Sequence, residues 1–457
     1  MTAAPKTSRR AIPAVGRVLE ALGIRDLPRP LATQLVRQHL ASLRRAGSVP
    51  SLEEIVRDIQ AEIGRLAQSR LQPVINGTGI VLHTNFGRAP LAPVAVRRVA
   101  EIAASYNNLE YDITNGGRGS RAAYLERCLA LACCGEAATV VNNGAAALVL
   151  MVRHFTKKKR EVVISRGELV QIGGGFRVGE ILEASGARLR EVGATNQTTL
   201  DDYAAAIGPE TAFVLRVHQS NFYIGGFTET PPNESIALLA RNRRVPFVVD
   251  LGSGSLSATE TLGLSEHEPT PAETLKQGAE LVCFSGDKLL GGAQAGIIAG
   301  KKRLVAALKR EPIFRALRCD KMVLAALEAT VDLHLGKATN QLPALHLLSL
   351  PSEKLRARGE TLLARLRLLP CEIRLAESAT EIGGGALPRS KIDSIVLEIS
   401  SPQISPNDVA AFLRKQTPPV VGCVANNRFK LDLRTIFPEQ DELVAAALTA
   451  CLTKTVA

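Results

Sequence analysis

The sequence lacks the features that mark membrane, secreted and nucleotide-binding proteins. No stretch of its 457 residues approaches the roughly 20 consecutive apolar residues that cross a bilayer. The basic segment Met1–Arg10 leads into no apolar signal core. A Walker phosphate loop and a Gly-x-Gly-x-x-Gly dinucleotide motif are both missing. We therefore expect a cytoplasmic protein whose functional site is of another kind.

Metal and disulfide signatures are missing as well. The eight cysteines form no Cys-x-x-Cys pair, and the adjacent Cys133 and Cys134 fit neither a zinc site nor a disulfide framework. The seven histidines show no His-x-x-x-His spacing. We therefore expect no metal, and we interpret the cysteines as small buried hydrophobic residues in a reducing compartment.

The chain does carry a strong and unevenly placed positive charge. Residues 1–70 contain twelve Lys/Arg and six Asp/Glu, so half of the net charge of +12 lies in this segment. Such a segment is typical of nucleic-acid binding, although a solvated basic helix explains the charge nearly as well. Its helices hold almost no aromatic residues, which favours contacts to phosphate over stacking on bases.

The same segment predicts a small helical domain. Apolar residues recur at helical spacing within 15–22 and 31–43, and Pro28 and Pro30 are expected to break the chain between them. The segment Ser51–Glu54 has the pattern of a capping box that opens a third helix.

From residue 73 to about 330 the pattern changes to alternating strands and helices. The apolar, β-rich runs are 139–141, 161–164, 213–217, 247–249 and 281–284, and the helical patterns are 123–132, 145–155, 178–184 and 235–241. This alternation predicts an α/β domain with a parallel or mostly parallel sheet covered on both faces. Catalytic residues should then lie at the carboxyl ends of the strands.

A helical stretch, 321–347, leads to a third unit. Strands are expected at 394–399 and 429–434 and helices at 409–414 and 442–452, which indicates an α+β C-terminal domain. We therefore divide the chain into a basic helical domain (1–70), a catalytic domain (71–330), and a linker helix with a C-terminal domain (331–457).

The most informative residue is Lys288, which stands between the apolar run 281–284 and the pair Gly291 and Gly292. A lysine beside apolar walls has its charged form disfavoured, and it then becomes a usable nucleophile toward an aldehyde. Ser285 can bind a phosphate group. The alternative is a surface lysine in a tight turn.

Pyridoxal phosphate is an aldehyde cofactor that such a lysine could bind, and two further segments supply the other parts of a site for it. Asp250 ends the strand 247–249, where a carboxylate could pair with a protonated pyridine nitrogen; the alternative is an aspartate that caps a turn. Asn143, Gly144 and Ala145 lie where a strand turns into a helix, so their backbone N–H groups suit a phosphate.

Other polar residues follow expected strands. His83–Arg88 comes after an expected strand at Ile80–Leu82, and His218 and Asn221 follow the strand 213–217, so their side chains are expected at the same cleft. Arg315 and Arg318 are expected on one helical face, where guanidinium groups could bind a second anion. Ordinary ion pairing of these arginines, and a structural role for His218, stay open.

Several long motifs resemble those of the bacterial selenocysteine synthases, the L-seryl-tRNA(Sec) selenium transferases. The matching segments are 76–79, 83–88, 106–112, 116–121, 141–143, 167–173 and 284–292. The resemblance covers nearly the full length, including the basic helical segment. Two positions depart from the family pattern: Gly144, where a third asparagine is common, and Gly175, where alanine or serine is usual.

The resemblance implies a fold-type-I aminotransferase architecture with pyridoxal 5′-phosphate carried by Lys288. It also implies a ring of dimers and an N-terminal domain that recognises tRNA. Arg88, Arg315 and Arg318 would then hold the donor, selenophosphate. The implied reaction dehydrates L-seryl-tRNA(Sec) to aminoacrylyl-tRNA and adds selenium to give L-selenocysteinyl-tRNA(Sec). The alternatives are a pyridoxal-phosphate lyase acting on a small amino acid or amino sugar phosphate, and a non-catalytic RNA-binding protein.

Overall fold

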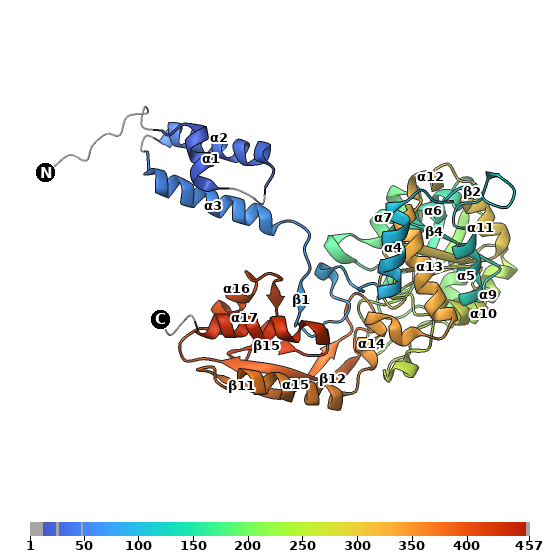
Figure 1. Ribbon diagram of the computed structural model, residues 1–457. Helices are drawn as coiled ribbons and strands as arrows, with labels where there is room; N and C mark the ends of the chain where they lie inside the picture. Colours follow the sequence, from blue (N-terminus) through green and yellow to red (C-terminus); the bar gives the residue numbers. More distant parts are fainter. Residues whose placement is uncertain (1–11, 24–26, 47–48, 454–457) are drawn as a thin grey trace. The chain divides into compact units, whose positions relative to one another are not determined.

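The computed structural model describes residues 12–23, 27–46 and 49–453, and the chain divides by its contacts into two units, Met1–Pro73 and Val74–Ala457 (Figure 1). This division lies three residues beyond the expected boundary at 70. Helix α13 (Lys321–Leu335) runs across the expected boundary at 330, and the three-domain division stays a prediction. No helix in the described ranges is long and apolar enough to span a membrane.

The first unit contains the helices α1 (Val15–Leu22), α2 (Arg29–Ala46) and α3 (Leu52–Gln68). They pack around buried aliphatic side chains that include Val18, Val36 and Ile55. The predicted capping box is confirmed, since Ser51 and Glu54 each bond the other's backbone N–H. The expectation that Pro30 breaks the chain is wrong. It lies in the first turn of α2, where a helix tolerates a missing N–H.

The second unit contains a seven-stranded sheet in the order β4-β10-β9-β8-β7-β5-β6. The strands are β4 (Ala137–Val141), β5 (Glu161–Ser165), β6 (Arg188–Val192), β7 (Thr211–Val217), β8 (Phe247–Gly252), β9 (Leu281–Ser285) and β10 (Gly296–Gly300). β10 pairs antiparallel with β4 and β9, and the other pairs are parallel. The predicted mostly parallel sheet is confirmed, and β6 and β10 were missed.

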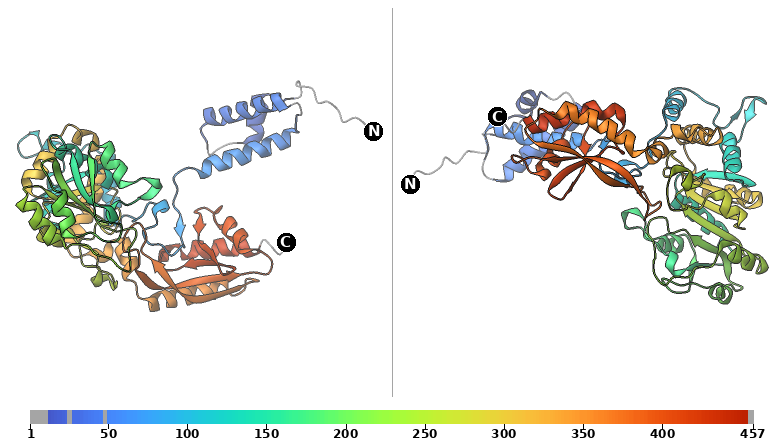
Figure 2. Two further views of the ribbon diagram at one scale, coloured as in Figure 1. Left: turned by 180° about the vertical axis from the view of Figure 1, so that it is seen from behind. Right: turned by 90° about the horizontal axis from the view of Figure 1, so that it is seen from below.

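Helices cover both faces of this sheet (Figure 2). One face packs against α5 (Ala123–Ala132), α9 (Asn233–Asn242), α10 (Pro271–Lys276) and α13. The other packs against α6 (Gly144–Phe155), α7 (Val178–Ala184) and α11 (Lys302–Lys309). Neighbouring residues of β5 bury on opposite faces, Val163 with the first cluster and Val162 with the second. The inner strands, such as β8 and β9, are therefore largely apolar, because both faces of the sheet are covered.

The C-terminal part of the second unit is the expected α+β fold. Its antiparallel sheet has the order β11-β12-β15-β14, with β11 (Glu372–Glu381), β12 (Lys391–Ser400), β14 (Cys423–Ala425) and β15 (Arg428–Asp432). The helices α15 (Ser352–Leu366), α16 (Pro406–Leu413) and α17 (Asp441–Thr453) bury their apolar residues with those of β12 and β15. β11 and α15 were not predicted.

Shorter elements connect these layers. They are β1 (Ile75–Asn76), η2 (Thr84–Phe86), α4 (Pro93–Ala104), β2 (Tyr111–Asp112), β3 (Gly117–Arg118), η3 (Arg166–Glu168), η4 (Gly173–Gly175), α8 (Leu200–Ala206), η5 (Thr259–Leu262), α12 (Phe314–Leu317), η6 (Thr339–Gln341), α14 (Pro343–Ser349), β13 (Val420–Val421) and η7 (Pro438–Gln440). The expected strand at Ile80–Leu82 is wrong. Ile80 forms an isolated bridge with Glu381, at the end of β11, and the chain then turns. Because this partner lies far away in the sequence, the local pattern did not reveal how short the pairing is.

None of the eight cysteines, all of which lie in the described ranges, forms a disulfide. The expectation that they are buried hydrophobic residues holds for Cys133, Cys283, Cys319 and Cys451 but is wrong for two others, 134 and 423, which are exposed.

Candidate active site

Lys288 lies in the tight turn that follows β9, as its sequence context predicts. Its Nζ atom is 3.4 Å from the main-chain oxygen of Gly385. Burial lowers the pKa of Lys288, and the positive charge of Arg88 lowers it further, against the opposing effect of Asp250, Asp287 and Glu268. The lysine therefore has the raised fraction of neutral amine that a nucleophile needs.

Asp250 lies near the end of β8, on the strand next to β9. The two strands pair Asp250 with Cys283, and an Asp250 oxygen accepts a hydrogen bond of 3.0 Å from the backbone N–H of Gly252. Burial raises the pKa of Asp250, and the charge of Lys288 opposes that rise. A desolvated carboxylate of this kind is suited to pairing with a cationic ring nitrogen.

The turn before α6 meets Ser285. The Asn143 side chain caps this helix by accepting a 2.8 Å hydrogen bond from Ala146 N–H. A Cβ atom at Gly144 would lie 3.0 Å from Ser285 Oγ, so the absence of a side chain keeps this space open. The free N–H groups of the first turn, with that of Ala145 among them, and the serine hydroxyl together fit a phosphate group.

Glycines also keep space open around the lysine amine. A Cβ atom at Gly252 would lie 3.8 Å from Lys288 Nζ and 2.8 Å from Ser220 Oγ. A Cβ atom at Gly385 would lie 3.3 Å from the same Nζ and 3.2 Å from the Cβ of Asn221. Asn221 therefore lies at the lysine, and its Nδ2 donates a 2.8 Å hydrogen bond to the Gln171 carbonyl.

His218 directly follows β7 and lies beside a buried carboxylate. Its Nε2 is 3.3 Å from Oε1 of Glu268, which is only 1% exposed, and its backbone N–H donates a 2.8 Å bond to the Asp250 carbonyl. Sequence reasoning missed Glu268, because the polar run around it carries no sign of burial.

Glu168 is a second buried carboxyl group that sequence reasoning did not single out, although it belongs to the motif at 167–173. Its Oε2 accepts a 3.0 Å hydrogen bond from Val217 N–H, and its Oε1 is 3.4 Å from Nε of Arg216. Burial raises the pKa of Glu168 to about 7, with Arg216 opposing the rise.

Arg88 is brought to the lysine through Asp287. It adopts a positive φ of 64°, and its Nη1 is 2.5 Å from Oδ2 of Asp287, the residue before Lys288. The main-chain oxygen of Asp287 also accepts a 3.2 Å hydrogen bond from Ala89 N–H. The loop that carries Arg88 is thus held against the Lys288 turn.

Arg315 and Arg318 line a cavity of about 480 Å³ whose lining includes neither Lys288 nor Arg88. The expectation that both lie on one helical face is wrong, because α12 ends at Leu317 and Arg318 has extended backbone. The segment that carries Arg318 still lies against the turn before α6, since the Leu317 carbonyl accepts a 2.9 Å hydrogen bond from Asn142 N–H.

The structure gives a local reason for each of the two glycines that depart from the family pattern, Gly144 and Gly175. Gly175 has a φ of +82°, a conformation that strongly favours glycine. It lies in the loop before α7, where the Gln171 carbonyl receives Asn221. At Gly144 the close approach of Ser285 leaves little room for a larger residue.

Comparison with known proteins places this site in a family. A sequence model of L-seryl-tRNA selenium transferases matches residues 74–437. The chain belongs to the L-seryl-tRNA selenium transferase family. The protein named L-seryl-tRNA(Sec) selenium transferase from Carboxydothermus hydrogenoformans is 43% identical over 446 residues, covering 94% of this chain and 95% of its own. The protein of that name from Geobacter sulfurreducens is 41% identical, with coverages of 96% and 98%.

Solved structures show the fold. The structure of D-glucosaminate-6-phosphate ammonia-lyase matches with a TM-score of 0.60 and 19% identity, covering 90% of this chain and all of its own. The predicted family and fold-type-I class are confirmed.

Enzymes of the selenium transferase family depend on pyridoxal 5′-phosphate, and this chain's residues fit that cofactor. Three groups lie along one edge of the sheet. They are a lysine whose pKa is lowered, a buried carboxylate on the next strand, and the start of a helix where a glycine leaves space beside a serine hydroxyl. The roles of the individual residues stay predictions.

Proposed function

We propose that this chain converts L-seryl-tRNA(Sec) to L-selenocysteinyl-tRNA(Sec). The seryl hydroxyl leaves as water with the α-proton, and selenium from selenophosphate forms a bond to the same carbon. The phosphorus–selenium bond breaks, and water takes up the phosphoryl group, which leaves as phosphate. Two observations together carry the proposal. Proteins named L-seryl-tRNA(Sec) selenium transferase match this chain along 94–96% of its length, and a buried lysine of lowered pKa lies at the expected strand end.

The residues around Lys288 have separate tasks in this proposal. The Lys288 amine would anchor pyridoxal phosphate and, once the seryl amino group has displaced it, would remove the proton from the α-carbon of the seryl group. The cofactor supplies a sink for the negative charge that develops on that carbon. Asp250 pairs with the ring nitrogen, and Ser285 Oγ and the start of α6 at Asn143, Gly144 and Ala145 hold the phosphate.

His218 and Asn221 complete the cofactor pocket. Oε1 of Glu268 lies 3.3 Å from Nε2 of His218, and the His218 backbone N–H is bonded to the Asp250 carbonyl, so His218 is fixed next to the strand end that carries Asp250. Asn221 borders the amine of Lys288 through the open space at Gly385. Both groups therefore limit how the cofactor and the seryl group can be placed around the reactive amine.

Arginines hold the anionic donor. Arg88 lies beside the lysine, and we assign it, together with Arg315 and Arg318, to the selenophosphate group because guanidinium forks match tetrahedral oxyanions. The segment that carries Arg318 lies against the turn that leads to Gly144.

The first unit would recognise the tRNA. Half of the net positive charge lies in residues 1–70, which supports phosphate contacts in that unit. We also propose a homo-oligomer built as a ring of dimers, acting in the cytoplasm where charged tRNA is used. A lyase for amino sugar phosphates is not favoured, because relatives of 40–43% identity carry the selenium transferase name.

The test uses the purified holoenzyme with seryl-tRNA(Sec) and selenophosphate, and it measures selenocysteinyl-tRNA against an ordinary seryl-tRNA control. Product from the selenocysteine tRNA alone is the expected result. No product from an enzyme that demonstrably holds its cofactor would refute the proposal and favour a lyase that acts on small molecules.

A further inference from the structure

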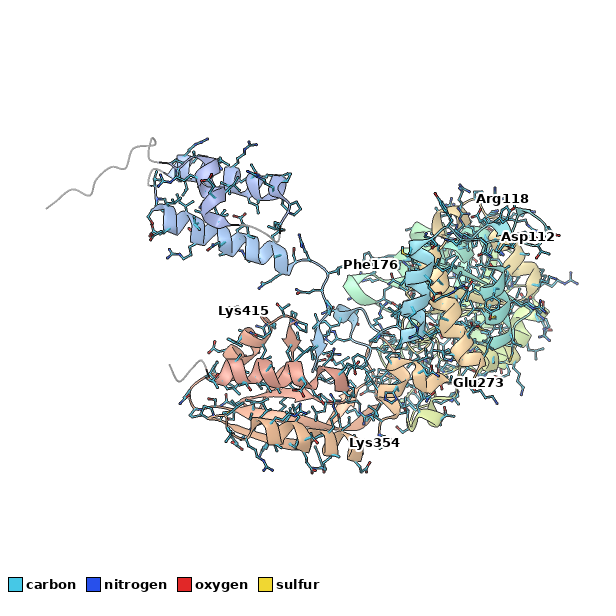
Figure 3. All side chains as sticks on the ribbon, viewed as in Figure 1. Asp112, Arg118, Phe176, Glu273, Lys354 and Lys415 are labelled. Carbon is cyan, nitrogen blue, oxygen red and sulfur yellow. The ribbon has the colours of Figure 1, made fainter. Side chains whose placement is uncertain are left out.

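Three arginines converge on one carboxylate beside the cavity that Arg315 and Arg318 line. Oε1 of Glu110 accepts hydrogen bonds of 3.1 Å from Nη1 of both Arg121 and Arg318, and its Oε2 accepts one of 3.0 Å from Nη2 of Arg118. The Glu110 carbonyl also accepts a 2.9 Å bond from Gly119 N–H. These contacts tie the hairpin of β2 and β3, on which Figure 3 labels Asp112 and Arg118, to the segment that follows α12.

The cluster carries more positive than negative charge. Three guanidinium groups share a single carboxylate, and the side chains of Glu110, Arg121 and Arg318 are only 22–28% exposed, whereas Arg118 is 78% exposed. The Nε–H groups of Arg121 and Arg318 are buried and have no hydrogen-bond partner. A guanidinium group has five N–H donors, and the bonds to Glu110 and to the Cys319 carbonyl use only some of them. Both groups therefore keep Nη donors for an anion that has several oxygens.

Arg121 and Arg318, the two less exposed arginines of the cluster, are each anchored by a further contact. An Nη2 contact to the Cys319 carbonyl fixes Arg121 from the other side, and Arg318 follows a residue whose carbonyl is bonded to Asn142 N–H. Glu110 is the group that joins these two separately anchored arginines. Without it, adjacent guanidinium groups would repel each other and lose their shared orientation.

We propose that Glu110 is a positioning residue of the donor site. It holds Arg121 and Arg318 in one orientation, so that a tetrahedral oxyanion meets a preformed pair of guanidinium groups. Binding then does not bear the cost of ordering two long side chains. This inference rests on the proposed function, because the donor there is a phosphate-like anion, and it adds Glu110 and Arg121 to the residues that decide its affinity.

The test replaces the carboxylate with its neutral isostere, Glu110→Gln, in the full-length holoenzyme. We expect the donor KM to rise about tenfold or more while kcat at saturating donor stays within about threefold. The KM for seryl-tRNA and the visible absorption band of the cofactor should not change. Inhibition by inorganic phosphate should weaken by the same factor as donor binding.

Glu126→Gln is a matched control. Glu126 lines the same cavity but pairs with Lys309 and Thr139, so its loss removes an equal charge without releasing an arginine. We expect the donor KM of this variant to stay within about twofold of the wild-type value, because the charge of Glu126 pairs with Lys309 and not with the two arginines. An equal rise in both variants would overturn the positioning role, because it would mean that cavity charge alone is responsible.

Other outcomes also decide the question. An unchanged or lowered donor KM in Glu110→Gln would show that the carboxylate competes with the donor or is idle. If that variant does not fold, Glu110→Asp keeps the charge but shortens the reach, and it should raise the donor KM to a smaller extent. An unaltered KM in that variant would equally refute the proposal.

The inference can be separated from the reaction itself. If the wild-type holoenzyme makes no selenocysteinyl-tRNA, calorimetry with inorganic phosphate still compares wild type with Glu110→Gln. Weaker phosphate binding in the variant would keep the positioning role while the proposed reaction failed. Equal binding in the two proteins would remove the positioning role on its own.

Discussion

Replacing Glu168 with glutamine should remove a pH-dependent loss of stability from this protein. Glu168 is 4% exposed, and burial raises its pKa from 4.5 to about 7. That difference corresponds to a penalty of about 3 kcal/mol on the ionised form in the folded protein. The hydrogen bond from Val217 N–H and the charge of Arg216 offset burial only in part.

The direction of the effect follows from the raised pKa. Below pH 4.5 the group is protonated in both the folded and the unfolded chain, so it adds no penalty. Between pH 4.5 and about 7 the unfolded chain ionises while the folded chain keeps its proton, and stability falls. Above pH 7 the loss is complete. Glutamine cannot ionise, so Glu168→Gln should gain about 3 kcal/mol relative to wild type across this window.

Urea unfolding at intervals from pH 5 to 8.5 measures the difference between the two proteins. Midpoints convert to free energy where the transitions are reversible and the slopes agree. A constant offset is expected from the amide, which places an N–H₂ group or a weaker acceptor against Arg216. A difference that stays flat over the whole pH range would refute the reasoning, because Glu168 would then ionise alike in both states. Arg216→Met removes the opposing cation and should extend the loss to higher pH.

Three further changes probe the site and the tRNA unit. Lys288→Ala should abolish the visible band of the lysine-bound cofactor and lower turnover by about 10³-fold or more, and an unchanged spectrum would contradict the assignment of this lysine. Gly144→Ala places a Cβ atom 3.0 Å from Ser285 Oγ and should weaken cofactor binding in equilibrium dialysis, whereas Gly208→Ala, where nothing lies within 4 Å, should not. Removal of residues 1–73 should keep the cofactor band but weaken binding of seryl-tRNA(Sec), and unaltered affinity in a filter-binding assay would contradict the role of that unit.

Local patterns were enough to predict the elements that carry the lysine and the aspartate. β8 and β9 are apolar runs that end in polar residues, and Asp250 and Lys288 lie at or just beyond those ends. Parallel neighbouring strands bring such ends to one edge of a sheet. The position of both groups was therefore predictable from the sequence without any knowledge of tertiary contacts.

The strands that were missed have weaker local signals. β6 (Arg188–Val192) contains three charged and two apolar residues and lies at the edge of the sheet, so its sequence resembles an exposed segment. β10 (Gly296–Gly300) is five residues long and begins and ends with glycine, which is depleted in strands. Its antiparallel placement between β4 and β9 depends on pairing with both neighbours, and a single sequence does not reveal that pairing.

Long-range contacts decide the chemistry of Lys288 itself. Besides burial, its pKa depends on Arg88, Asp250 and Glu268, which come from distant segments, and on Asp287, the residue before it. Three of these four are carboxylates, which favour the charged amine, yet burial and the single arginine outweigh them. The sequence predicts a lysine in an apolar setting, but it does not predict how many charges surround the lysine or from which loops they come.

Asp287 explains how that balance is maintained. Its carboxylate pairs with Arg88 at 2.5 Å. Its main-chain carbonyl accepts a hydrogen bond from the N–H of Ala89, the residue after Arg88. The carboxylate nearest in sequence to Lys288 still favours the ammonium form of the lysine, but it also pairs with Arg88, whose charge has the opposite effect. In the sequence Asp287 looks like an ordinary turn residue. In the fold it attaches the Arg88 loop to the catalytic turn, and this attachment places a cation beside Lys288 and keeps the pKa of the amine low.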